Sequence, residues 1–70
     1  QPTNAKLRAR ALGMVRALTG CDGTAAQTAL DEAGGDVRVA TLMRTQGMGA
    51  AAARERLLAA GGRLDRALDG

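Results

Sequence analysis

The sequence predicts an all-α fold, a compact bundle of about five short helices, and three observations support it. Apolar residues recur at helical spacing, so each stretch has an apolar side to bury. Single and paired glycines separate these stretches where helices are expected to end. The chain has no aromatic residue, so the core must consist of Leu, Val, Met and Ala. Seventy residues suit one small domain spanning residues 1–70.

Residues 1–19 are predicted to form a basic first segment. It consists of an extended lead-in over residues 1–4 and a helix that runs to about residue 19. Pro2 disfavours helix at Gln1, and Thr3 or Asn4 can cap the helix that follows. The apolar positions fall at steps of four, three, one and three and form one stripe that is expected to face the core: Leu7, Ala11, Met14, Val15 and Leu18. Residues 1–21 carry four basic side chains and no acid, whereas residues 22–70 carry six arginines against seven acids.

Residues 20–46 predict a first helix–Gly-Gly–helix unit. Gly20 ends the first helix, and Asp22 caps a helix over about residues 23–33. Gly34-Gly35 forms a turn, because glycine adopts positive φ without the clash of a Cβ atom. Asp36 then caps a helix over residues 37–46 that ends at Gly47. This helix has apolar residues on two faces, which predicts that neighbours cover both of them.

Residues 47–70 predict a second unit of the same kind. A helix over about residues 49–60 starts without a side-chain acceptor, because Met48 and Gly49 offer none. Gly61-Gly62 follows, and then a helix of one or two turns over about residues 63–69. A shift of 27 residues aligns the two units with eight identities, from Gly20 with Gly47 to Ala40 with Ala67. We expect the units to stack on the first helix into one core, because neither buries enough alone.

No catalytic, metal-binding or cofactor-binding residue is predicted in this chain. Cys21 is a single thiol without any histidine to activate it, and it cannot build a zinc site alone. Glu32 and Glu55 are expected on solvent-facing sides of their helices. No apolar run is long enough for a signal peptide or a membrane span. The chain opens Gln1-Pro2 without an initiator Met, so we expect a fragment of a longer protein.

Two known families share features with the sequence. The first three helices have the proportions of a ubiquitin-associated (UBA) domain, although Thr19-Gly20-Cys21 replaces that domain's usual Met/Leu-Gly-Phe/Tyr loop. The stronger resemblance joins several motifs: Pro2-Thr3-Asn4-Ala5-Lys6-Leu7, then Leu18-Thr19-Gly20, Ala33-Gly34-Gly35-Asp36-Val37 and Leu42-Met43. Over essentially all seventy residues, this pattern resembles the C-terminal part of bacterial N-acetylmuramic acid 6-phosphate etherases.

The etherase resemblance implies an accessory helical lid or dimer-supporting domain. That family cleaves the D-lactyl ether of its substrate and gives N-acetylglucosamine 6-phosphate and D-lactate during the recycling of cell-wall peptidoglycan. Its catalytic glutamate lies in a preceding sugar-isomerase α/β domain, which is the implied partner of this chain. The family is cytoplasmic, typically dimeric and independent of metals and cofactors.

Two sets of residues are candidate sites. Lys6, with Asn4 and Thr3 nearby, is expected to help close over the sugar phosphate in the intact enzyme, because an ammonium group and a helix N-terminus both favour an anion. Alternatively, the chain is a UBA-like protein-interaction module that uses an apolar face of Val39, Leu42 and Met43. Nucleic-acid binding through the basic first helix is a weaker alternative, because no aromatic side chain is available to stack on bases.

Overall fold

The computed structural model describes the backbone of residues 2–69 and the side chains of residues 5–69. Within this range the regular structure is entirely helical, which confirms the predicted all-α class. The helices are α1 (Pro2–Thr19), α2 (Gly23–Glu32), α3 (Val37–Gln46), α4 (Ala50–Ala59) and α5 (Leu64–Asp69). They form an elongated body with extents of 35 × 22 × 18 Å. None of the described helices has the length and apolar character needed to cross a bilayer.

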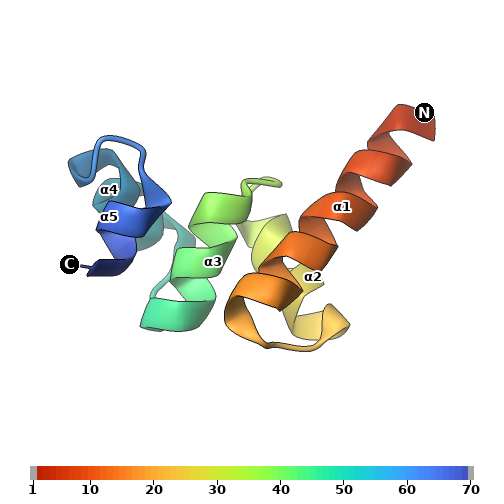
Figure 1. Ribbon diagram of the computed structural model, residues 1–70, viewed down its shortest axis with the longest axis horizontal. Coiled ribbons are helices and arrows are strands. Elements are labelled where there is room, and N and C mark those ends of the chain that lie inside the picture. Colours follow the sequence, from red (N-terminus) through yellow and green to blue (C-terminus); the bar gives the residue numbers. More distant parts are fainter. Residues whose placement is uncertain (1, 70) are drawn as a thin grey trace.

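Helix α3 lies at the centre of the molecule and is shared by two groups of helices. It packs with α1 and α2 on one side and with α4 and α5 on the other (Figure 1). Four successive residues of α3 are buried, namely Val39, Ala40, Thr41 and Leu42. This confirms the prediction that neighbours cover α3 on both apolar sides. The Thr41 hydroxyl oxygen is also buried, and it has no hydrogen-bond partner among the described residues.

The two Gly-Gly turns have the same backbone geometry. Gly34 and Gly35 have φ values of 66° and 88°, and Gly61 and Gly62 have 69° and 78°. In each turn the second glycine donates its N–H to the carbonyl of a core leucine five residues earlier. The donor–acceptor distance is 2.8 Å in both cases, to Leu30 and to Leu57. These bonds satisfy carbonyls that a helix end would otherwise leave free.

The core also repeats at the same shift of 27 residues. Ala26 and Ala53 are completely buried, Leu30 and Leu57 are nearly so, and Ala40 and Ala67 occupy the matching places on α3 and α5. Small alanines at these positions let the short helices approach closely. The repeat seen in the sequence therefore corresponds to a repeat of backbone and packing.

The helix caps follow the local sequence in most places. Asp22 accepts from the backbone N–H of Ala25, and Asp36 accepts from those of Arg38 and Val39. Gly47 ends α3 in the left-handed conformation, as predicted, and Gly49 starts α4 without a side-chain cap.

The prediction of an extended lead-in over residues 1–4 is wrong, because α1 already begins at Pro2. Proline fits the first helical position, since its φ is preset and its missing N–H would have no partner there.

The apolar stripe of α1 is a second correction. Only Val15 of that stripe is fully buried, whereas Leu7, Met14 and Leu18 remain 56%, 48% and 50% exposed. Helix α1 has 18 residues and α2 and α3 have 10 each, so α1 is longer by about 12 Å. In Figure 1 its N-terminal half projects beyond the other helices. The two short neighbours therefore cover one narrow side of α1 and leave the rest uncovered.

Candidate interaction surface

The candidate phosphate-binding residues lie in the first turns of α1. Lys6 is exposed there. Because α1 begins at Pro2, Thr3 and Asn4 are within the helix and are not its N-cap; their side chains lie outside the described residues. The role of Lys6 toward a phosphate stays a prediction.

The face predicted to bind a partner is largely internal. Val39 is 2% exposed and Leu42 is completely buried, and both belong to the core that α3 forms with its neighbours. Met43 is half-buried and borders a surface hollow with residues of α2, among them Ala29 and Glu32. These side chains hold the chain's own helices together, so they do not form the exposed face that the two-sided pattern suggested.

The residues that could carry chemistry are dispersed. Glu32 and Glu55 are exposed on different helices, α2 and α4. Among the described residues, no group of three or more acidic, cysteine or histidine side chains could hold a metal ion. Cys21 is half-buried, and its sulfur lies 3.0 Å from the hydroxyl oxygen of Thr19. That hydroxyl donates its single proton to the carbonyl of Val15 at 2.7 Å, so the thiol is the donor toward Thr19.

Three arginines bind backbone carbonyls of neighbouring helices and turns. The guanidinium group of Arg38 on α3 donates to the carbonyl of Gly62 at 3.0 Å, and that of Arg54 on α4 donates to the carbonyl of Glu32 at 3.3 Å. Arg56 donates to the carbonyl of Ala67 at 2.9 Å. Arg54 remains exposed while it makes its bond, and Arg56 is half-buried. These bonds link the two units across α3 and tie α4 to α5.

Asp36 completes this network at the start of α3. Partial burial would raise the pKa of its carboxyl group. The hydrogen bonds from the Arg38 side chain and from the backbone N–H groups of Val39 and Arg38, with the positive charge of Arg38, outweigh that effect. The net result is a pKa below the usual value of 3.8. Asp36 is thus ionised when it caps α3 at neutral pH.

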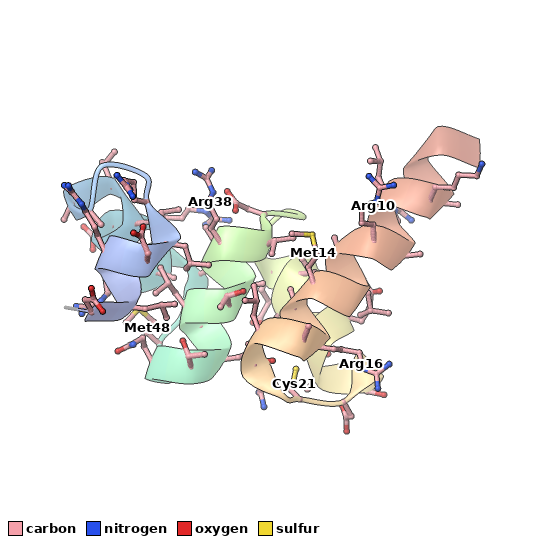
Figure 2. All side chains as sticks on the ribbon, viewed as in Figure 1. Arg10, Met14, Arg16, Cys21, Arg38 and Met48 are labelled. Atoms are coloured by element: carbon pink, nitrogen blue, oxygen red, sulfur yellow. The ribbon has the colours of Figure 1, made fainter. Side chains whose placement is uncertain are left out.

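The exposed side of α1 is the most distinctive surface of the molecule. Leu7, Ala11, Met14 and Leu18 follow a 4–3–4 spacing, and we call them the α1 stripe. Three of these side chains are about half exposed, and Ala11 is half-buried. Figure 2 shows Arg10 and Met14 along the same edge of the helix and Arg16 on its other side. The basic residues are spread around α1, which differs from a single basic face.

A groove continues the α1 stripe toward α2. Its volume is about 620 Å³, and Leu7, Arg8 and Ala11 line one wall. Leu30, Asp31 and the first Gly-Gly turn line the other. Asp31 already accepts a hydrogen bond of 2.9 Å from the Gln27 side chain. The stripe and the groove together form a surface that could receive a helix from outside the described residues.

The helical spacing of the α1 stripe predicts that it faces the core, so it does not predict this surface. The lengths of the predicted helices held the missing signal. A first helix of 16 to 18 residues cannot be covered along its whole length by partners of about ten residues. Part of the apolar stripe therefore has to stay exposed.

The chain is similar to part of the N-acetylmuramic acid 6-phosphate etherases. It is 52% identical over 60 residues to the etherase of Deinococcus radiodurans, covering 86% of this chain and 20% of the relative. Identity is 48% over 68 residues with that of Cutibacterium acnes, covering 97% of this chain and 22% of the relative. It is 46% over 66 residues with that of Rhizobium rhizogenes, covering 94% and 22%.

These similarities confirm the resemblance to the etherase family over nearly the whole chain. The chain spans about one fifth of the length of the curated relatives that it matches. No protein-family model matches it, and no solved structure does. The likeness of the first three helices to a UBA domain therefore stays a prediction.

Proposed function

We propose that this chain is the accessory C-terminal helical domain of an N-acetylmuramic acid 6-phosphate etherase. The whole protein would cleave the D-lactyl ether of its substrate to give N-acetylglucosamine 6-phosphate and D-lactate. The observation that carries the proposal is the identity of 46% to 52% with three etherases, spread over most of this chain but a fifth of theirs. The exposed α1 stripe supports an accessory role, because it offers a surface for the rest of such a protein.

In this proposal a sugar-isomerase α/β domain of the same protein supplies the catalytic glutamate. The helical domain acts as a lid over the substrate, supports a homodimer, or does both. The protein works in the cytoplasm, in the recycling of peptidoglycan sugars. It requires no metal or cofactor.

The test compares the full-length protein with a truncated form that lacks residues 1–70. We expect the full-length protein to release D-lactate from N-acetylmuramic acid 6-phosphate and the truncated form to have a reduced kcat/KM. Light scattering of both forms measures whether the domain supports a dimer. A full-length protein without etherase activity would contradict the assignment. The same kcat/KM in both forms, together with the same number of subunits in each assembly, would contradict the accessory role.

Lys6 is the residue of this chain that we assign to the substrate phosphate. Lys6→Ala in the full-length protein should raise the KM for substrate with little change in kcat, because a phosphate contact serves ground state and transition state alike. Arg16→Ala is the matched control, since it removes one exposed positive charge from the other end of α1. An unchanged KM in Lys6→Ala, or an equal rise in both variants, would contradict this role.

A further inference from the structure

The α1 stripe has the spacing of a helix–helix contact. Leu7, Ala11, Met14 and Leu18 are separated by four, three and four residues, which is the repeat that keeps apolar side chains along one seam between two helices. A small residue among larger ones lets a partner helix approach closely. Yet no other described helix covers this seam, since the three large side chains are 48% to 56% exposed.

The basic side chains beside the stripe favour a partner helix with acidic residues. Arg8 and Arg10 lie in the helical turn between Leu7 and Ala11. At 3.6 residues per turn they fall on opposite sides of the seam. Residues 1–21 contain four basic side chains and no acidic one. Pairing of α1 with α1 of a second copy would therefore bring the basic side chains of the two helices together, with no acidic side chain on either helix, which disfavours association. A helix with acidic residues beside its own apolar seam has the complementary charge.

We infer that the α1 stripe binds an amphipathic helix with acidic flanks. This helix is supplied by the part of the same protein that lies outside this chain. This inference rests on the proposed function and names the surface through which the helical domain docks. The relatives are about five times as long as the stretch that this chain matches, so they contain ample sequence to supply such a helix. Arg8 and Arg10 orient the incoming helix through its acidic residues, and the stripe provides the apolar contact.

Leu58 shows why exposure alone does not define the surface. It is 80% exposed on α4, more than any residue of the α1 stripe. Its helical neighbours at three and four residues' distance on α4 include Arg54 and Glu55, which are exposed and charged. Leu58 is therefore an isolated apolar side chain, and single exposed leucines are common on protein surfaces.

Methionine oxidation in the full-length protein tests the inference. Hydrogen peroxide is applied to the native and the urea-unfolded protein, and mass spectrometry gives the rate of sulfoxide formation at Met14, Met43 and Met48. With the stripe uncovered, Met14 should react nearly as fast as in the unfolded chain. If a helix covers it, we expect oxidation of Met14 in the native protein to be at least about tenfold slower. Half-buried Met43 and Met48 report whether the domain itself is folded.

Charge variants test the acidic partner. Replacing both Arg8 and Arg10 by Glu should restore rapid oxidation of Met14 while Met43 stays unchanged. Arg16→Glu makes the same kind of change on the other side of α1 and should leave Met14 protected (Figure 2). Leu58→Gln should likewise have no effect. Added salt should weaken the protection in the wild type, because the guiding charges are screened.

Several results would overturn the inference. Met14 as reactive in the native as in the unfolded protein would show that nothing covers the stripe. Protection that disappears on about hundredfold dilution would assign it to a second copy. Protection that appears only after addition of phosphatidylglycerol vesicles would assign it to a membrane. Protection unchanged in the double Arg variant would refute an acidic partner.

The same preparation separates this inference from the proposed function. D-lactate release together with an unprotected Met14 would leave the etherase assignment standing and remove the docking surface. A protein without etherase activity whose Met14 is protected and responds to the Arg variants would remove the etherase assignment. It would leave the docking surface standing.

Discussion

The two Gly-Gly units share their backbone but differ in how their helices begin. In the first unit Asp22 caps α2 and Asp36 caps α3, each with a carboxylate bound to backbone N–H groups. In the second unit Gly49 and Arg63 stand at the corresponding positions, and neither offers a side-chain acceptor. Glycine turns and buried alanines thus suffice to specify the fold twice, whereas side-chain caps stabilise one copy more than the other. We expect the second unit to open first.

Removing a core side chain of the shared helix should give the largest effect. Leu42→Ala deletes a completely buried side chain of α3 and should destabilise the chain by about 2–5 kcal/mol. Because α3 serves both units, amide hydrogen exchange should accelerate in α2 and in α4 alike. Leu57→Ala should affect mainly the second unit. Urea unfolding gives the free energy of unfolding, with Leu58→Ala as an exposed control. Acceleration confined to one unit after Leu42→Ala would contradict a shared core.

The Gly-Gly turns should come next in magnitude. Gly35→Ala and Gly62→Ala each place a Cβ atom at positive φ, which costs about 1–2 kcal/mol. Gly62→Ala should cost about as much as Gly35→Ala, since its Cβ atom would lie 3.6 Å from the Arg38 guanidinium, which is an ordinary van der Waals contact. Thermal unfolding of both variants and of the wild type measures this cost. Equal stability of wild type and Gly35→Ala would mean that the turn tolerates another conformation.

The cap of α3 should have a smaller effect and a pH dependence. Asp36→Ala removes the acceptor of two backbone N–H groups and should cost about 1 kcal/mol. The pKa of Asp36 is lowered in the folded state, so its contribution is fully present above its unfolded pKa near 3.8 and is lost as pH falls through the folded value. Unfolding free energies measured from pH 7 to pH 2 should therefore converge for wild type and Asp36→Ala at the acidic end.

Asp36→Asn separates the two parts of that contribution. An Asn side chain keeps an acceptor for the cap but loses the charge that faces Arg38. We expect a stability between those of the wild type and Asp36→Ala, without the acid-dependent loss. A wild-type pH profile in Asp36→Asn would show that another carboxyl group causes the dependence.

Giving the second unit the cap of the first should have the smallest effect. Gly49→Asp introduces the acceptor that Asp22 supplies in the first unit and should stabilise the chain by a few tenths of a kcal/mol. Gly49 has φ −77° and ψ 171°, and an added Cβ atom would meet nothing within 4 Å. Hydrogen exchange should slow in α4 and leave α2 unchanged. A destabilised Gly49→Asp would show that capping is not what distinguishes the units.

Features decided within a few residues were predictable from the sequence. The bounds of α3, its cap at Asp36 and its end at Gly47 follow from local chemistry, and so do the paired glycines of both turns. The start of α1 is an exception, although it is also local. Proline disfavours helix at the residue before it but fits the first turn of a helix itself, and the second property sets the start of α1 at Pro2.

Features decided by distant packing were not predictable in the same way. Periodicity marked Leu7, Met14 and Leu18 as apolar on one side of α1 but could not show that short neighbours leave them exposed. Similarly, the two apolar faces of residues 37–46 predict that neighbours cover this helix, but only the fold shows which helices these are, namely α1, α2, α4 and α5. The bonds from Arg38 and Arg54 to carbonyls 24 and 22 residues away have no local signature.

The double membership of α3 has a consequence for mutational tolerance. A buried segment of this helix has to pack against α1 and α2 on one side and against α4 and α5 on the other. A substitution that improves packing on one side can therefore disturb packing on the other. The α5 residues that correspond to α3 by the 27-residue shift lie at the end of the molecule and contact α3 and α4. A saturation library should therefore accept fewer replacements between residues 39 and 42 than between 66 and 69, even though the two segments occupy equivalent positions in the repeat.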